Sequence, residues 1–380
     1  MPWPTKKLGE VCEFVFGYSF NADDFNEQGK GLPVIRIGDI DKGITEKFYD
    51  KEYDDKYLVE KGEILIGLSG SIKIDKWKGK KALLNQRIVK VCNFKHEILE
   101  DFVFYQLHSI LKRLEIQIAQ GTVKNLLLPH LSNLKILVPP LKTQQKIVER
   151  LDAIKKAQEL NDKQIELAEE LFKSLLHCEL DPKGKNWEVK KLIEVCEINP
   201  KTVLNKKIDK VRYVEMTAID ENLKTIKYYL DRSINKVSSG APKFTNNDII
   251  FARITPCTEN GKIALVDNCK DICAGSTELH VLRPKKDKIL PHFLFYFIIT
   301  PKIRNIAVAS MIGSTGRQRV PAEFFHYLKI PLPPLETQQK IVEKLSAVQE
   351  YKKKLLDQKQ KLQELFESVL NKSFKGEWVG

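Results

Sequence analysis

The chain has 380 residues, of which 42% are hydrophobic and 30% are charged, as is typical of a folded globular protein with two or more domains. No apolar run approaches the ~20 residues that a membrane-spanning helix needs, and the N-terminus lacks the apolar segment of a secretory signal. We therefore expect no membrane partner. The seven cysteines are an odd number and lack the spacing of a disulfide framework, which fits a reducing, cytoplasmic location. The net charge of +13 favours a polyanionic partner, with a basic but inert surface as the alternative.

Each half of the chain opens with strand-like runs that are bounded by glycine or by turn residues. The predicted strands are 32–40 and 63–70 in the first half, and 211–219 and 248–255 in the second. Helical patterns follow at 100–119 and 291–309. These patterns predict an α+β fold with two tandem α/β domains, at 1–141 and 179–335.

The two halves repeat one another. The stretch "PPLKTQQKIVERL" at 139–151 recurs as "PPLETQQKIVEKL" at 333–345, with eleven of thirteen positions identical. "WPTKKLGEVCE" at 3–13 likewise recurs as "WEVKKLIEVCE" at 187–197. A repeat of this length indicates a tandem domain duplication and not a solenoid, whose units are much shorter.

A long helix is predicted to close each half, at 142–178 and at 336–375, followed by a short tail at 376–380. The double proline ends the preceding strand, and Thr143 and Thr337 are the candidate N-caps. Apolar residues then recur at alternating steps of four and three, the pattern of a coiled-coil seam. Polar residues interrupt the seam midway, at Gln158, Asn161, Lys352 and Lys359. The alternative is that each amphipathic helix packs only on its own domain.

Most of the positive charge lies outside these helices. Counted over 142–178 and 336–372, the helices carry net charges of zero and +2, so +11 of the +13 belongs to the rest of the chain, almost all of it in the two domains. Two segments are the candidate nucleic-acid contacts: "KIDKWKGKK" at 73–81 and the Gly-rich "GSTGRQRVP" at 313–321. Arg and Gln suit base edges, whereas Lys suits phosphate. For any single residue the alternative is a solvated surface charge. The candidate DNA-binding residues are Arg36, Lys73, Lys76, Trp77, Lys78, Lys80, Lys124, Asn125, Arg253, Ser314, Thr315, Arg317, Gln318 and Arg319.

Recognisable catalytic and metal-binding motifs are missing from the sequence. It contains no Gly-x4-Gly-Lys-Ser/Thr phosphate loop, no His-Glu-x-x-His and no Gly-x-Ser-x-Gly nucleophile elbow. The pair of cysteines in "CKDIC" at 269–273 has no second pair with which to hold zinc. We expect no catalytic residue, no cofactor and no metal in this chain.

The sequence resembles the specificity subunits of type I restriction–modification systems along nearly its whole length. The motifs that carry the resemblance are the repeated "PPL…TQQKIV" helix start, "GYSFNADDFNEQGKGLPVIRIGDI" at 17–40, "NDIIFARIT" at 247–255 and "GSTGRQRVP". The tail "FKGEWV" at 374–379 echoes "PKGKNWEV" at 182–189, as if a third repeat were beginning.

The resemblance implies two target-recognition domains held apart by two antiparallel helices, in a pseudo-two-fold and pseudo-circular arrangement. Such a subunit reads a bipartite, asymmetric DNA target with an unread spacer. It docks two modification subunits, which are adenine methyltransferases that use S-adenosylmethionine, and through them the ATP-driven restriction subunits, for which Mg is also expected. The subunit itself catalyses nothing. The first half departs from the pattern, since "GTVKNLLLP" at 121–129 replaces the basic loop of the second half.

Three other functions remain open at this level. The first is a stand-alone DNA-binding or regulatory protein of the same fold. The second is an enzyme built on the same scaffold, which the missing motifs disfavour. The third is a coiled-coil adaptor that binds only proteins.

Overall fold

The computed structural model describes residues 3–68, 72–119, 128–203, 209–314 and 316–374. The chain forms two compact units. Unit 1 comprises Met1–Asp162 and Asp357–Gly380, and unit 2 comprises Lys163–Leu356. Each unit therefore holds one sheet-rich part and a segment of each of two long helices.

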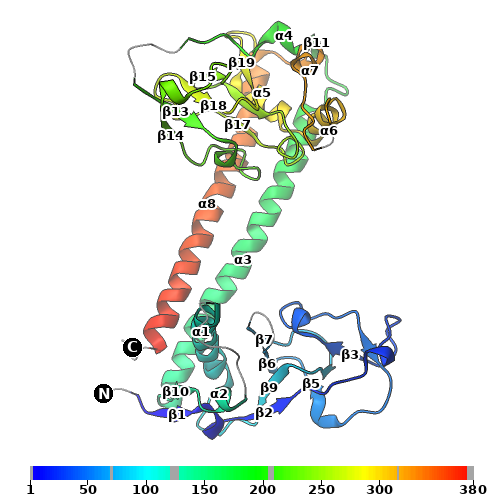
Figure 1. The fold of residues 1–380 in the computed structure, drawn as a ribbon, viewed down its shortest axis with the longest axis vertical. Helices are drawn as coiled ribbons and strands as arrows, with labels where there is room; N and C mark the ends of the chain where they lie inside the picture. The colour runs from blue at the N-terminus through cyan, green and yellow to red at the C-terminus, as the bar shows by residue number, and fades with distance from the viewer. Residues whose placement is uncertain (1–2, 69–71, 120–127, 204–208, 315, 375–380) are drawn as a thin grey trace. The chain divides into compact units, whose positions relative to one another are not determined.

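Unit 1 contains two four-stranded sheets and a two-stranded ribbon (Figure 1). The first sheet is antiparallel, in the order β2 (Glu13–Phe16), β9 (Ile88–Cys92), β6 (Ile64–Gly67) and β7 (Lys73–Lys76). The second has the order β4 (Phe48–Tyr49), β3 (Leu32–Ile35), β8 (Ala82–Leu84) and β5 (Leu58–Val59), and its β3–β8 pair is parallel. The ribbon joins β1 (Thr5–Lys7) to β10 (Lys135–Leu137), and the helices are α1 (Glu100–Ala119) and α2 (Leu128–Ser132).

The sheets of unit 2 repeat this strand order, as the predicted duplication requires. Its first sheet has the order β12 (Cys196–Ile198), β19 (Leu279–Pro284), β16 (Ile249–Ala252) and β17 (Ile263–Leu265). Its second has the order β14 (Leu230–Ser233), β13 (Lys210–Val214), β18 (Cys273–Gly275) and β15 (Lys243–Phe244), again with one parallel pair, β13–β18. The ribbon is β11 (Glu188–Lys191) with β20 (Lys329–Leu332), and the short helices are α4 (Leu192–Val195), α5 (Pro291–Ile298), α6 (Pro301–Ala309) and α7 (Ala322–Tyr327).

The strands are shorter than the sequence patterns predicted. The strand expected over 32–40 ends at Ile35, because the Asp39 carboxylate accepts the N–H of Arg36 and closes a 3₁₀ turn. The helix expected over 291–309 is two helices. Thr300 caps the second one by accepting the N–H of Ile303, and Pro301 occupies its first position, where no N–H is needed.

The two long helices are α3 (Leu141–Leu180) and α8 (Leu335–Phe374). Their predicted N-caps were wrong. The helix α3 begins at Leu141, and the N–H groups of Thr143 and Gln144 both donate to the carbonyl of Pro140, at 2.8 and 3.1 Å. Thr143 therefore lies inside the first turn, and Thr337 occupies the same place in α8, where the N–H of Gln338 donates to Pro334. Pro140 and Pro334 fit just ahead of the helix because a proline has no N–H to satisfy.

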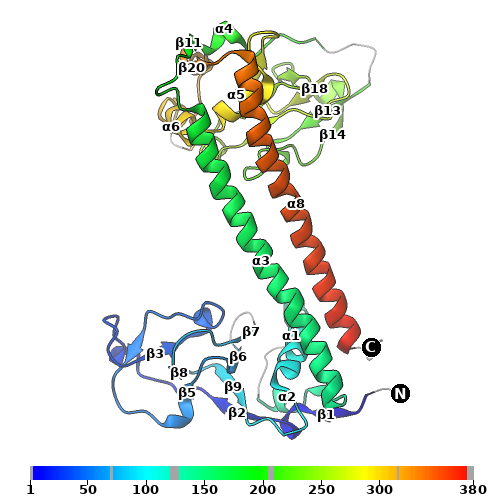
Figure 2. The ribbon, with the colours of Figure 1, turned by 180° about the vertical axis from the view of Figure 1, so that it is seen from behind.

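Segments of α3 and α8 run antiparallel within each unit (Figures 1 and 2). In unit 1, Asp162 pairs with Lys359 at 2.8 Å and Gln158 donates to the carbonyl of Leu362 at 3.3 Å. In unit 2, Glu169 pairs with Lys352 at 3.2 Å. Residue numbers thus rise along one helix as they fall along the other.

The helix ends belong to the cores of the units. In unit 1, Ile147 and Leu151 of α3 are buried in the same apolar cluster as Leu370 of α8. In unit 2, Ile341 and Leu345 of α8 are buried with Leu176 of α3. Each helix start therefore packs on its own repeat, while the end of the other helix completes that core. Neither helix packs on its own domain alone.

The polar residues predicted in the seam do not behave alike. Asn161 is buried, at 2% exposure. Lys359 is exposed and reaches Asp162 from the rim of the helix pair.

The repeated "TQQKIV" motif has a specific structural role. In both copies its first glutamine is buried, as Gln144 and Gln338. Gln144 accepts the N–H of Leu99 at 2.8 Å and donates to the carbonyls of Glu97 and Pro139, both at 2.9 Å. Gln338 makes the same three contacts in unit 2, with Leu290, Lys288 and Pro333. One side chain thus fastens the start of each long helix to the segment ahead of α1 or α5.

The cysteines differ in part from expectation. Cys12 and Cys196 are buried in the two repeats, as their apolar surroundings predicted. Cys269 and Cys273 are paired as a disulfide, a pairing that a fully reduced chain would not contain. Of the helices in the described ranges, none is apolar over a stretch long enough to cross a membrane.

Candidate nucleic-acid interface

In unit 2 the predicted "GSTGRQRVP" segment lies in a loop, 312–320, that folds back on itself. Ile312 and Arg319 exchange both of their backbone hydrogen bonds, at 3.0 and 2.9 Å. The same stretch also joins the segment after β16, because the N–H of Thr255 donates to Gln318 and that of Val320 donates to Arg253. The loop is therefore hydrogen-bonded on two sides.

A carboxylate holds this loop in place. Glu278 accepts from Arg319 at 2.8 and 2.9 Å and from Nε of Arg253 at 3.4 Å. Hydrogen bonding to Arg319 is the main reason why the pKa of Glu278 lies below its ordinary value, and Arg253 adds to the effect. The structure thus brings together two predicted site residues, Arg253 and Arg319, and ties both to one acid that the sequence analysis did not select.

A buried histidine lies within hydrogen-bonding distance of the loop. His280 of β19 lies at 1% exposure, and its Nε2 is 2.8 Å from the carbonyl of Val320. Its Nδ1 is 2.9 Å from Nδ2 of Asn199, whose own oxygen accepts the N–H of Val281. A carbonyl only accepts, so Nε2 carries the proton and Nδ1 accepts from Asn199. Burial lowers the pKa of His280, which favours this neutral form.

The tip of the loop carries the exposed side chains. Ser314, Arg317 and Gln318 are exposed, and the N–H of Arg317 closes a turn on the carbonyl of Ser314 at 2.9 Å. Thr315 lies outside the described residues, as do Lys124 and Asn125 of the first half. In this unit Arg317 and Gln318 are therefore better candidates for DNA contact than Arg253 and Arg319, which are bonded to Glu278.

In unit 1 the prediction for Trp77 was wrong. Its side chain is 1% exposed and belongs to an apolar cluster that joins residues of both sheets. Its indole N–H donates to the carbonyl of Lys80 at 2.6 Å, and a side chain at Gly79 would collide with its ring. Trp77 was predicted to contact nucleic acid because it lies within a lysine-rich run, but an apolar side chain of this size is more stable inside the core.

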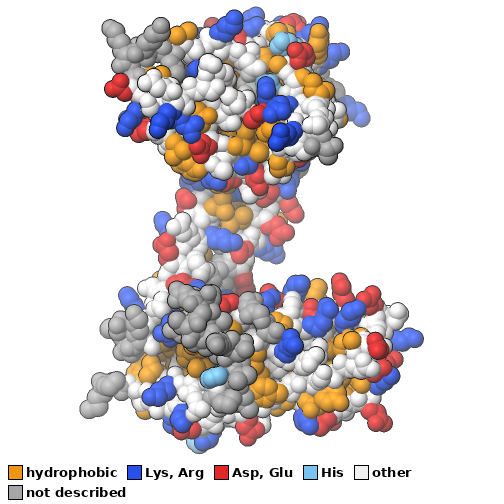
Figure 3. All heavy atoms as spheres, viewed as in Figure 1, with side chains coloured by type: hydrophobic (Ala, Val, Ile, Leu, Met, Phe, Trp, Pro, Cys, Tyr) orange, Lys and Arg blue, Asp and Glu red, His pale blue; other side chains and the backbone are white. Residues whose placement is uncertain are grey.

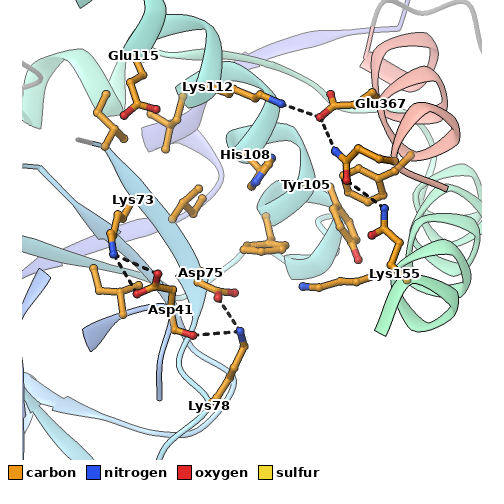
Figure 4. Close-up of a pocket in the computed structure, with 18 residues that line it drawn as sticks. Asp41, Lys73, Asp75, Lys78, Tyr105, His108, Lys112, Glu115, Lys155 and Glu367 are labelled. Carbon is orange, nitrogen blue, oxygen red and sulfur yellow. Dashed lines mark hydrogen bonds and ion pairs between the residues drawn. The ribbon is translucent and has the colours of Figure 1, made fainter. Parts of the chain in front are cut away.

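The lysines near Trp77 are mostly paired with acids. Lys73 contacts Asp41 at 3.0 Å, Lys78 contacts Asp75 at 2.8 Å, and Lys76 pairs with Asp101. Figure 4 shows Lys73 and Lys78 turned toward these carboxylates at one side of a pocket of about 550 Å³. Lys80 remains exposed. The segment 73–81 is therefore not a continuous strip of unpaired positive charge.

Arg36 lies in a different concave surface of unit 1, at the end of β3. Asp39 accepts from its Nε at 3.3 Å and orients its exposed guanidinium. The same surface is lined by Lys42 and by the turn between β8 and β9, residues 85–87. Asn85, Gln86 and Arg87 of this turn were not selected from the sequence. The one signal in the sequence is the change from polar residues to the apolar run of a strand within "NQRIVKV" at 85–91, which could have indicated a turn.

Charge alone does not single out either surface. On the face drawn in Figure 3, the Lys and Arg side chains of each unit are interleaved with acidic ones. Within the described ranges no three His, Cys, Asp or Glu side chains are grouped so that they could hold a metal ion. The two candidate surfaces are polar, loop-borne and rich in Arg and amide groups, which is the chemistry that reads base edges.

Comparison with known proteins identifies the class. The family of type I restriction modification DNA specificity domains matches residues 1–170 and 184–365, and the chain belongs to this family. The two matched segments correspond to the two repeats.

Two curated relatives are similar over almost the whole chain. The EcoBI specificity subunit of Escherichia coli is 23% identical over 99% of this chain and 86% of its own length. The MjaVIII specificity subunit of Methanocaldococcus jannaschii is 25% identical over 97% of this chain and 90% of its own length. The EcoAI specificity subunit of Escherichia coli is 35% identical, but over only 41% of this chain and 27% of that subunit.

Solved structures agree on the fold. The S subunit of the type I restriction–modification system of M. genitalium has a TM-score of 0.60 at 14% identity, over 98% of this chain and 96% of its own. A chain from a study of complex assembly in the type I system has a TM-score of 0.59 at 18% identity, over 98% of this chain and 97% of its own. At these identities the likeness extends to the fold alone.

Proposed function

We propose that this chain is the DNA-reading specificity subunit of a type I restriction–modification complex. Each repeat reads one half of a bipartite, asymmetric double-stranded target, and the bases between the two halves are not read. The chain itself performs no catalysis. The methyl transfer and the ATP-driven step belong to partner subunits, which bind S-adenosylmethionine, ATP and Mg. The complex would then be cytoplasmic, as its DNA target requires.

One observation carries this proposal: the same scaffold is used twice with different exposed side chains. The sheets of both units have one strand order, yet the candidate surfaces expose Arg36, Gln86 and Arg87 in unit 1 and Arg317 and Gln318 in unit 2. A duplicated scaffold with identical loops would suit a symmetric target. Loops that differ in chemistry at the same scaffold suit two different half-sites.

The long helices support the docking of modification subunits. On α3, Leu160, Leu167 and Leu171 are more than half exposed. Their spacings of seven and four residues place them on one face of the helix. Exposed leucines aligned in this way favour a helical protein partner over DNA. We propose that this face contacts a methyltransferase subunit.

Exchange of one repeat tests the proposal. Residues 179–335 are replaced by the equivalent segment of a relative, and the methylated sites in the host genome are profiled by single-molecule sequencing. We expect one half-site to change and the other to stay, because each repeat carries its own core and loops. A simultaneous change of both half-sites would refute the two-reader model.

Salt dependence separates a DNA-binding subunit from a protein-only adaptor. If the exposed cations of both units neutralise roughly 6–10 phosphates, DNA affinity falls by about 10³–10⁵ between 50 and 200 mM salt. A mobility-shift titration of the purified chain measures this change. A nearly flat response would favour the adaptor.

A further inference from the structure

The turns that join β8 to β9 and β18 to β19 are equivalent in the two repeats. In unit 1 the N–H of Ile88 donates to Asn85 and that of Leu68 donates to Arg87. In unit 2 the N–H of Leu279 donates to Ser276 and that of Arg253 donates to Glu278. The β-sheet register agrees, since Gly67 pairs with Ile88 as Ala252 pairs with Leu279. Arg87 and Glu278 therefore occupy the same place in the fold.

The charge at this place is reversed between the repeats. In unit 2, Glu278 points to the two arginines of the neighbouring loop and holds 312–320 in position. In unit 1, the position of Arg253 is taken by Leu68 and that of Glu278 by Arg87, so this bracing pair cannot form. A second reversal occurs nearby, where Arg36 precedes one 3₁₀ turn and Glu215 precedes its equivalent.

The turn of unit 1 is rigidly held, yet its side chains are exposed. The N–H of Gln86 donates to the carbonyl of Tyr18 at 2.8 Å, and the turn closes through Ile88 at 3.3 Å. Arg87 has a φ of 66°, a left-handed conformation in which its backbone is fixed by the N–H of Leu68 at 2.9 Å. Gln86 and Arg87 are both exposed and line one concave surface with Arg36 and Lys42. Side chains on a fixed backbone make better-defined contacts than side chains on a loose loop.

We propose that this turn is the base-reading element of the first repeat, with Gln86 specific for adenine and Arg87 specific for guanine. The proposal rests on the proposed function and refines it. It also replaces the lysine-rich segment 73–81 as the reader. The second repeat presents the same two kinds of side chain, Arg317 and Gln318, from loop 312–320. In the second repeat the pair thus lies on a different loop from the β18–β19 turn, which is the equivalent of the β8–β9 turn.

The chemistry of the pair sets the expected target. Arg donates two hydrogen bonds to O6 and N7 of guanine, and Gln bonds N6 and N7 of adenine, both in the major groove. Consecutive Cα atoms are ~3.8 Å apart, close to the ~3.4 Å rise of a base pair, so neighbouring side chains reach neighbouring base pairs. One half-site should therefore contain an adjacent adenine and guanine.

Selection from random duplexes tests this assignment. The full-length chain is purified from its host with the subunits that accompany it, and bound duplexes are sequenced. We expect Gln86→Ala to reduce the preference for the adenine by about tenfold or more, and Arg87→Asn to do the same for the guanine. Asparagine is chosen because it tolerates the left-handed backbone of position 87. The other half-site should stay unchanged in both variants.

Two controls separate base reading from loss of charge and from misfolding. Lys80→Asn removes an exposed charge of the same unit and should weaken binding to all sequences alike. Gln318→Ala should alter only the other half-site. If the wild-type protein selects a motif that both turn variants retain, the assignment is wrong while the proposed function stands. If the wild-type protein selects no motif, the proposed function fails and the assignment fails with it. Thermal melting of each variant verifies its fold.

Discussion

Glu278 holds two arginines, and its replacement measures how firmly loop 312–320 is fixed. In Glu278→Gln a single amide oxygen replaces a carboxylate that accepts three hydrogen bonds. The arginines keep access to water, so we expect a modest loss of about 1 kcal/mol in the free energy of unfolding. That corresponds to a fall of roughly 2–4 °C in Tm, measured by differential scanning calorimetry. Glu323→Gln, at an exposed position of the same unit, is the control and should leave Tm unchanged.

His280 predicts an acid-sensitive step in unit 2. Burial holds its pKa below the ordinary value of 6.5. The unfolded chain therefore binds a proton more readily than the folded chain, so stability is fully present above pH 6.5 and is lost as the pH falls from there toward the folded pKa. Protonation would also set an N–H of the ring against the amide of Asn199. Denaturant unfolding at pH 7.5 and 5.5 should show a lower midpoint at pH 5.5.

The pH effect can be assigned with two variants. His280→Gln should lower stability at both pH values and reduce the difference between them. His96→Asn, at a fully solvated position, should leave that difference as it is. His108 and His292 also have pKa values lowered by desolvation, so part of the slope should persist without His280. An unchanged slope in His280→Gln would contradict the assignment.

At the scale of elements, the two adjacent glutamines of the repeated motif provide a matched pair of mutations. Gln144→Ala leaves a part-buried N–H, a part-buried carbonyl and a buried carbonyl without their partner. We expect a loss on the order of 2–4 kcal/mol in the free energy of unfolding, since each buried polar group left unpaired is costly. Gln145→Ala, on the exposed side of the same turn, should change stability by less than about 0.5 kcal/mol.

The second copy allows the same test to be repeated independently. Gln338→Ala and Gln339→Ala should differ in the same way, because Gln338 is buried whereas Gln339 is exposed and bonds the exposed Glu343. Urea unfolding monitored by circular dichroism measures all four variants. Equal effects of the two members of a pair would mean that the motif is repeated for some reason other than this fastening.

At the scale of the whole molecule, the length of α3 is proposed to set the unread spacer of the target. Insertion of four residues after Asp162 lengthens the helix by ~6 Å and turns it by ~400°, about 40° beyond a full turn. At ~3.4 Å per base pair, we expect a spacer longer by one to two base pairs, with both half-sites unchanged. Methylation profiling of a strain that carries the insertion measures the spacer.

A shorter insertion provides the control. Two residues lengthen the helix by only ~3 Å but turn it by ~200°. One repeat should then no longer face its half-site, and methylation should be abolished. If the four-residue variant methylates sites with the original spacer, the length of the helices does not set the number of unread base pairs.

Local sequence determined the elements and the duplication, because these depend on short-range patterns that survive in one dimension. The two copies of "TQQKIV", the double prolines and the four–three spacing of apolar residues predict two long helices, and both are present. The segment 100–119 contains no proline, and it forms the single helix α1. The segment 291–309 contains Pro301, which ends one helix and begins another, so the counterpart of α1 is two helices. Family membership followed from the same motifs.

Tertiary structure alone decided which polar side chains face solvent. Trp77 and the lysines around it have the composition of a nucleic-acid contact, yet the indole lies in a core. Lys73 and Lys76 pair with acids that are distant in sequence, Asp41 and Asp101, and Lys78 pairs with Asp75, three residues earlier. Gln86 and Arg87 look unremarkable in sequence, but a backbone fixed by Tyr18 and Leu68 leaves them exposed. Composition gives the charge of a segment, whereas burial and pairing depend on residues that only the folded chain brings together.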